Sequence, residues 1–254
     1  MEDIYSEMTA VSQEIAASFP PARFYTCCRR FLTLSQSLFC EDQQISKCRA
    51  IVRDEMENNP GHGLYHGEKV AVEAGALLYL EAEELLMGEP GKQRAGILVQ
   101  MAGLLHDLCR GEKDHARLGA AAAGKILREF SFSPEEERMI VEAIANHEAF
   151  LEPQPIESPL GQLVSDVLYD ADKFRWGPDN FTLTLWEMLR FSRAPMVRLV
   201  HRFPKGMKGI ARIKETFRTR SGKTYGPEFI DLGLLIGDRI YQFLLERFAE
   251  ELSP

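Results

Sequence analysis

The chain has 254 residues, which is enough to bury a hydrophobic core as one large domain or two small ones. Hydrophobic residues make up 45% of the sequence and charged residues 27%, the usual balance of a globular protein. No apolar run is long enough to span a membrane, and the acidic first residues do not resemble a secretory signal. We therefore expect a cytoplasmic protein without a membrane partner.

Charge is distributed unevenly around the net value of −8. The stretch 193–223 contains ten Lys or Arg residues and a single acid, Glu215. Bulk nucleic acid is not an expected partner of so acidic a chain, but a local surface that faces an anion is indicated. Two interpretations stay open: the basic stretch attracts an anionic substrate into a site, or it is an exposed face or a homo-oligomer contact.

The five cysteines form an odd set without the spacing of a metal finger. The adjacent pair Cys27 and Cys28 offers no usable disulfide framework. Reduced thiols, as in a cytoplasmic protein, are the interpretation we adopt.

Apolar residues recur at three- and four-residue spacings along almost the whole chain, which predicts helices. A capping box strengthens one start, because Ser133 is followed by Pro134 and, three residues after the serine, by Glu136. Strand-type alternation is scarce, so we predict a single all-α domain. The expected helices cover residues 5–19, 45–58, 66–87, 93–107, 133–147, 159–174 and 227–252.

Histidines and aspartates gather at the expected ends of these helices. His66 opens a helix, the pair His106-Asp107 closes the next, His115 follows a short charged loop, and His147 closes the capped helix. Asp172 lies near the end of a further helix. Side chains at such junctions are able to converge without disturbing helix packing.

This order resembles that of the HD-domain superfamily of metal-dependent hydrolases. The matching motifs are His66 in "YHGEKV", His106-Asp107 in "LLHDL" and Asp172 in "DADKF". His115 in "HARLGA" and His147 in "IANHE" fall where the two-metal branch has its extra ligands. The resemblance implies an HD-domain helical bundle with a core at about 60–177, an N-terminal helical extension at about 1–55 and a C-terminal helical region at about 178–254.

Mixed imidazole and carboxylate ligands suit one or two ions of Fe, Mn, Co, Ni or Zn rather than Ca²⁺. The first ion would be bound by His66, His106, Asp107 and Asp172, and the second by Asp107, His115 and His147. Two such ions hold a bridging water and stabilise the charge that develops during phosphoester displacement. If a single ion binds, His115 or His147 becomes available for acid–base work.

Two alternatives are open within this set. Asp170 precedes Asp172 by two residues, and we prefer Asp172 because the last ligand of the family precedes a basic residue, here Lys173. His62 lies one helical turn before His66 and is either a substrate contact or an ordinary loop residue.

Cationic side chains near the motifs predict phosphate recognition. We expect the catalytic residues Asp107, His115 and Lys173, with substrate contacts from His62, Arg110, Lys113, Lys173 and Arg175.

The expected function is that of a metal-dependent phosphohydrolase acting, through a metal-bound hydroxide, on a small phosphomonoester, nucleotide or dinucleotide polyphosphate. Some relatives with six ligands are mixed-valent di-iron oxygenases, which is the first alternative, and a non-catalytic nucleotide-sensing module is the second. No Gly-Tyr-Pro follows His147-Glu148, which argues against the branch that cleaves cyclic di-GMP.

Overall fold

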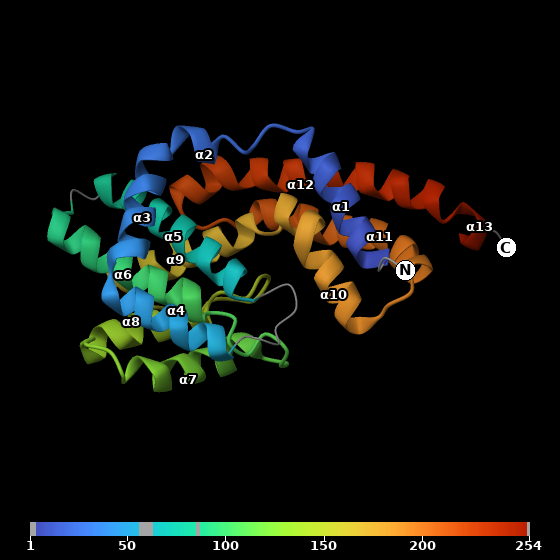
Figure 1. Ribbon diagram of the computed structural model, residues 1–254. Helices are drawn as coiled ribbons and strands as arrows, with labels where there is room; N and C mark the ends of the chain where they lie inside the picture. Colours follow the sequence, from blue (N-terminus) through green and yellow to red (C-terminus); the bar gives the residue numbers. More distant parts are fainter. Residues whose placement is uncertain (1–3, 56–62, 85–86, 253–254) are drawn as a thin grey trace.

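The computed structural model describes residues 4–55, 63–84 and 87–252, and these ranges contain helices and no strand, which confirms the predicted all-α fold (Figure 1). The helices are α1 (Ile4–Ala17), α2 (Phe24–Cys27), α3 (Arg29–Glu41), α4 (Gln43–Glu55), α5 (Leu64–Glu84), α6 (Glu89–Leu105), α7 (His115–Leu127), α8 (Pro134–Ala145), α9 (Pro159–Phe174), α10 (Leu185–Ser192), α11 (Met196–Ala211), α12 (Arg220–Arg247) and α13 (Ala249–Leu252). A π-helical turn, η1 (Asn180–Thr184), precedes α10, and a 3₁₀ turn, η2 (Arg212–Glu215), precedes α12.

Serine side chains fix the starts of two helices whose far ends approach the site. The Ser133 hydroxyl accepts a hydrogen bond from the Glu136 amide, and the Glu136 carboxylate accepts one from the Ser133 amide, so the predicted capping box is confirmed. Ser158 caps α9 in the same manner by accepting from the Gly161 amide. Both helices continue with Pro at their first position, where its missing N–H costs nothing.

Helix α6 lies at the centre of the fold and is apolar on nearly every side. Its residues from Ala95 to Leu105 are all buried, and it packs against α3, α4, α5, α8 and α9. A helix without a polar face is stable in water only when others surround it. The residues that follow α6 are therefore held inside the protein.

Small residues bring α5 and α6 into backbone contact close to the expected ligands. A Cβ atom on Gly103 would lie 2.6 Å from the Cα atom of Ala71, and one on Gly67 would lie 3.4 Å from the Gly103 carbonyl oxygen. Helix α7 also approaches closely, because a Cβ on Gly119 would lie 3.1 Å from the carbonyl oxygen of His106. A larger residue at Gly103 would move the helices that carry the site, because its Cβ would meet backbone atoms.

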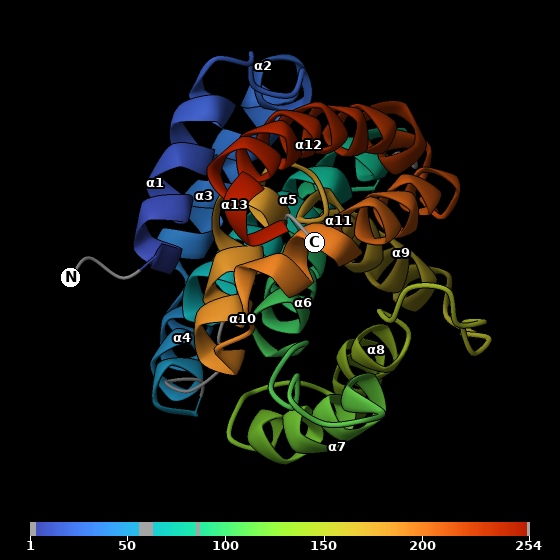
Figure 2. The ribbon, with the colours of Figure 1, turned by 90° about the vertical axis from the view of Figure 1, so that its right-hand side faces the viewer.

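The 28-residue helix α12 runs along one side of the molecule, with α1 and α11 beside it (Figures 1 and 2). It packs on α9, and Asp170 of α9 fixes the chain before it by accepting hydrogen bonds from the Arg218 amide and from the amide and hydroxyl of Thr219. One buried hydrophobic cluster extends from Met8 to Phe248.

Among the described residues, no helix combines the length and the apolar character needed to cross a bilayer. All five cysteines carry free thiols.

Candidate metal centre

The six expected ligands come from five separate segments of the chain. His66 lies in the first turn of α5, His106 and Asp107 directly follow α6, His115 opens α7, His147 lies two residues after α8, and Asp172 lies in the last turn of α9. Five of these side chains are buried and His115 is half-buried. The structure brings all six together.

The first group surrounds the Nε2 atom of His66. That atom lies 3.2 Å from Nε2 of His106, 3.6 Å from Oδ2 of Asp107 and 3.4 Å from Oδ1 of Asp172. The His106 Nε2 atom lies 3.4 Å from the same Asp107 oxygen and 3.7 Å from the same Asp172 oxygen. Two imidazoles and two carboxylates therefore direct ligand atoms toward one point.

The second group shares Asp107 with the first. Ligand atoms of Asp107, His115 and His147 lie within 4.8 Å of one another, and the Asp107 Oδ1 atom lies 3.4 Å from His147 Nε2. The imidazole rings of His115 and His147 have centroids 5.2 Å apart. The two oxygens of Asp107 face different groups, so this carboxylate belongs to both sets of candidate ligands.

Backbone carbonyls orient two of the imidazoles. Nδ1 of His106 lies 2.8 Å from the Gly103 carbonyl oxygen, and Nδ1 of His147 lies 2.6 Å from that of Ile144. A carbonyl only accepts, so each Nδ1 donates to it and each ring turns its Nε2 toward the cluster. Metal-binding histidines are usually held in this way. Within the described ranges, the buried Nε2 of His147 has no hydrogen-bond partner, and a bound ion would satisfy it.

Both aspartates are ionised in the cluster. Burial opposes the charge on Asp107, but His106 and His147 outweigh it and hold the pKa of Asp107 well below its usual value. Burial also opposes the charge on Asp172, which Lys173 and His106 outweigh, so its pKa is likewise lowered. The residues present thus fit a divalent transition metal, which supplies positive charge and accepts imidazole lone pairs.

Lys173 and Arg175 point toward carboxylates of the protein. The Lys173 ammonium, only 2% exposed, donates to Oδ2 of Asp172 at 2.5 Å and to the carbonyl oxygen of His147 at 2.8 Å. The Arg175 guanidinium is buried and donates to the carboxylates of Glu73 and Asp179. Both residues line the cavity at the cluster, and their expected substrate contacts stay predictions.

The other expected contacts differ in position. Arg110 lies at the cavity, where its guanidinium donates to Nε2 of His115 at 2.7 Å. An ion bound through that nitrogen would displace Arg110. Lys113 is exposed and does not line the cavity. His62 lies outside the described residues. Asp170, the alternative to Asp172, binds the chain before α12 and not the cluster.

The cavity beside the cluster has a volume of about 350 Å³. Its lining includes residues that were not expected to form a site, among them Trp176, Asn180, Thr184 and Met188. The last three are four residues apart and continue from the π-helical turn into α10. That spacing is the only sequence signal for these residues, and it also fits an ordinary helix face.

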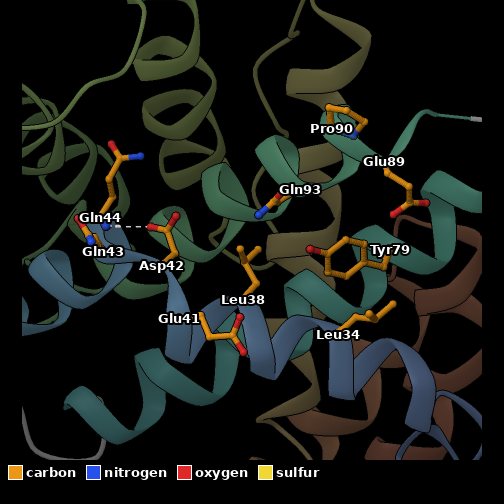
Figure 3. A pocket seen from close by; sticks show the side chains of 10 residues that line it. All are labelled: Leu34, Leu38, Glu41, Asp42, Gln43, Gln44, Tyr79, Glu89, Pro90 and Gln93. Carbon is orange, nitrogen blue, oxygen red and sulfur yellow. Dashed lines mark hydrogen bonds between the residues drawn. The ribbon is translucent and has the colours of Figure 1, made fainter.

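A different cavity, shown in Figure 3, lies beside α3, the start of α4 and the facing parts of α5 and α6. It has a volume of about 820 Å³ and no histidine in its lining. Its Asp42 carboxylate accepts hydrogen bonds from the amides of Gln44 and Ile45, so this acid caps α4. The cavity offers no comparable ligand set.

Comparison with known proteins assigns no family: no family model matches the chain, and no curated protein or solved structure was found to match it.

Proposed function

We propose that this protein is an HD-type, metal-dependent phosphohydrolase that acts on a small phosphomonoester, nucleotide or dinucleotide polyphosphate. The observation that carries the proposal is the buried cluster in which Asp107 belongs to both groups of candidate ligands. A carboxylate shared between two imidazole-rich groups would hold two ions near each other, and a pair of neighbouring ions supports phosphoester hydrolysis.

Each side chain has a defined task in this proposal. His66, His106, Asp107 and Asp172 would hold one ion, and Asp107, His115 and His147 the other. Ions of Fe, Mn, Co, Ni or Zn would supply Lewis acidity and an activated water.

The cavity supports a small substrate. Its volume of about 350 Å³ is at the lower end of the range of small-molecule sites. Arg110 at its wall is suited to donate to phosphoryl oxygens, as arginine commonly does. Lys173 keeps Asp172 and the His147 backbone in place through its two hydrogen bonds.

The first test is elemental analysis of the purified protein, followed by a screen of phosphorylated compounds with the metal that is found. We expect His106→Ala and Asp107→Ala to lose bound metal and phosphate release together. His201→Ala is the matched control, since His201 is exposed and lies outside the cluster, and it should retain both. Metal at about a hundred times its dissociation constant should stabilise the wild type by roughly 2.7 kcal/mol, and Asp107→Ala should not respond.

Three results would contradict the proposal. Retention of bound metal by both cluster variants would show that His106 and Asp107 are not metal ligands. Substrate-dependent oxygen uptake by the iron-loaded protein, without anaerobic phosphate release, would favour the oxygenase alternative. Metal that stabilises the protein while no phosphorylated compound is turned over would favour a nucleotide-sensing module.

A further inference from the structure

A groove of about 820 Å³ adjoins the cavity of the metal centre. It lies along α10 and the start of α11, and its lining shares Arg110 and Met188 with that of the cavity. Met188 is 50% exposed at this boundary. A ligand bound at the metal centre can therefore extend past Met188 into the groove.

Three arginines give the groove a positive charge. Arg193 follows α10, and Arg198 and Arg202 lie four residues apart on α11, so the latter two share one helix face. All three are exposed, and none forms an ion pair with a carboxylate of the described chain. No described acidic residue lines the groove.

Other arginines of this protein behave differently. Arg94 binds the Glu136 carboxylate with two nitrogens, and Arg175 is held between two buried or half-buried carboxylates. Those guanidiniums are used to hold helices together. The guanidiniums of the groove keep their donors available for an anion, and arginine binds phosphate and carboxylate in bidentate geometry.

The backbone between α10 and α11 adds to this positive charge. Arg193 has φ 49° and ψ 36°, the left-handed region in which a helix usually ends on glycine or asparagine. Arginine stands there despite the steric cost. Ala194 and Pro195 also line the groove, which places it at the N-terminal end of the 16-residue helix α11. The partial positive charge of a helix N-terminus favours anions.

The remaining lining is apolar. Leu185 and Leu189 of α10 contribute to it, and Phe191 at the same edge is 72% exposed. An exposed phenylalanine beside an aliphatic wall suits the carbon-rich or ring-shaped body of an organic molecule. Inorganic phosphate alone would leave this surface unused.

We propose that the groove formed by Arg193, Arg198 and Arg202 binds a second anionic group of the substrate, while the phosphoryl group to be cleaved lies at the metal centre. The substrate class is a small organic molecule with two separate phosphate groups on one body, such as a nucleoside bisphosphate. That the phosphoryl group at the metal centre is cleaved rests on the proposed function, whereas binding of the second anionic group in the groove does not. Of the two interpretations of the basic stretch, this selects attraction of an anionic substrate.

The test compares two probes on the full-length, metal-loaded protein: the phosphorothioate analogues of a nucleoside 3′,5′-bisphosphate and of its 5′-monophosphate, which resist hydrolysis. Calorimetry should give a dissociation constant about tenfold lower for the bisphosphate, as expected from charge-assisted hydrogen bonds to one additional phosphate. Arg198→Ala and Arg202→Ala should each remove most of this preference and leave monophosphate binding unchanged within about twofold. Lys205→Ala is the matched control, because Lys205 is an exposed cation of α11 that does not line the groove.

Equal affinity for the two probes would overturn the inference. So would a loss in Lys205→Ala as large as that in Arg198→Ala, because the preference would then arise from the overall charge of α11. Bisphosphate binding that depends on the arginines, in a protein that releases phosphate from no compound, would refute the phosphohydrolase and leave the groove assignment standing.

Discussion

Replacement of Lys173 by methionine tests whether this lysine holds the metal centre together. Lys173 is 2% exposed, and its ammonium group bridges the Asp172 carboxylate of α9 and the His147 carbonyl, which follows α8. Methionine keeps the apolar stem and removes the charge. Breaking a buried ion pair by removing one partner costs up to about 3–5 kcal/mol, because the other charge stays buried, here with only His66 and His106 to offset it. For a chain of this size, each kcal/mol lowers the unfolding midpoint by about 2–4 °C, so a decrease of roughly 6–20 °C is expected.

The assay is thermal and urea unfolding of chelator-treated protein, followed by circular dichroism. Lys113→Met is the control, since Lys113 is exposed, and its stability should change by less than about 0.5 kcal/mol. In a double-mutant cycle, adding Asp172→Asn to Lys173→Met should recover part of the loss, because the buried carboxylate charge is then removed as well. Unchanged stability of Lys173→Met would refute the reasoning and leave Lys173 free to contact substrate.

Two further predictions concern the helices that carry the site. Gly103→Ala should destabilise the protein by about 1–3 kcal/mol and weaken metal binding, because the new Cβ would meet the Ala71 backbone at 2.6 Å. Gly124→Ala, with room for a Cβ in α7, should instead stabilise the protein by up to about 1 kcal/mol. Changes of the same sign for both variants in urea unfolding would contradict this account. Hydrogen bonds from Arg94 outweigh the opposing effect of burial and lower the pKa of Glu136 to about 2 from a usual 4.5. The ionised Glu136 therefore contributes its full stabilisation above about pH 5, and this contribution is lost as the pH falls toward 2. The difference in unfolding free energy between wild type and Glu136→Gln should shrink over that range, and a difference independent of pH would show that the charge of this side chain contributes nothing.

Much of the fold was predictable because its signals are local. Apolar periodicity identified seven of the helices but not α3 or α11, and the Ser133 capping box marked the start of α8 to the residue. Helix ends also indicated where His106, Asp107 and His147 would lie, since each follows the last apolar turn of its helix. The division into an HD core with two flanking regions stays a prediction.

Pairing of charges was not predictable in the same way. Arg175 binds Glu73, which lies 102 residues earlier in the chain, and no local pattern connects the two. Lys173 donates to Asp172 and the His147 carbonyl, two partners that no local pattern indicated, and its expected contact with a substrate phosphate stays a prediction because it also lines the cavity. The arginine groove depends on the turn between α10 and α11, where Arg193 takes a left-handed conformation.

The sequence by itself determined the all-α class and which side chains are able to bind metal, because helix periodicity and ligand chemistry depend on residue type and short spacing. The tertiary structure alone decided which side chains meet. Asp170 and Asp172 are two residues apart on α9, so they project from opposite faces of the helix. Because α12 packs on one face and α5 and α6 pack on the other, Asp170 binds the chain before α12 and Asp172 lies beside the histidines.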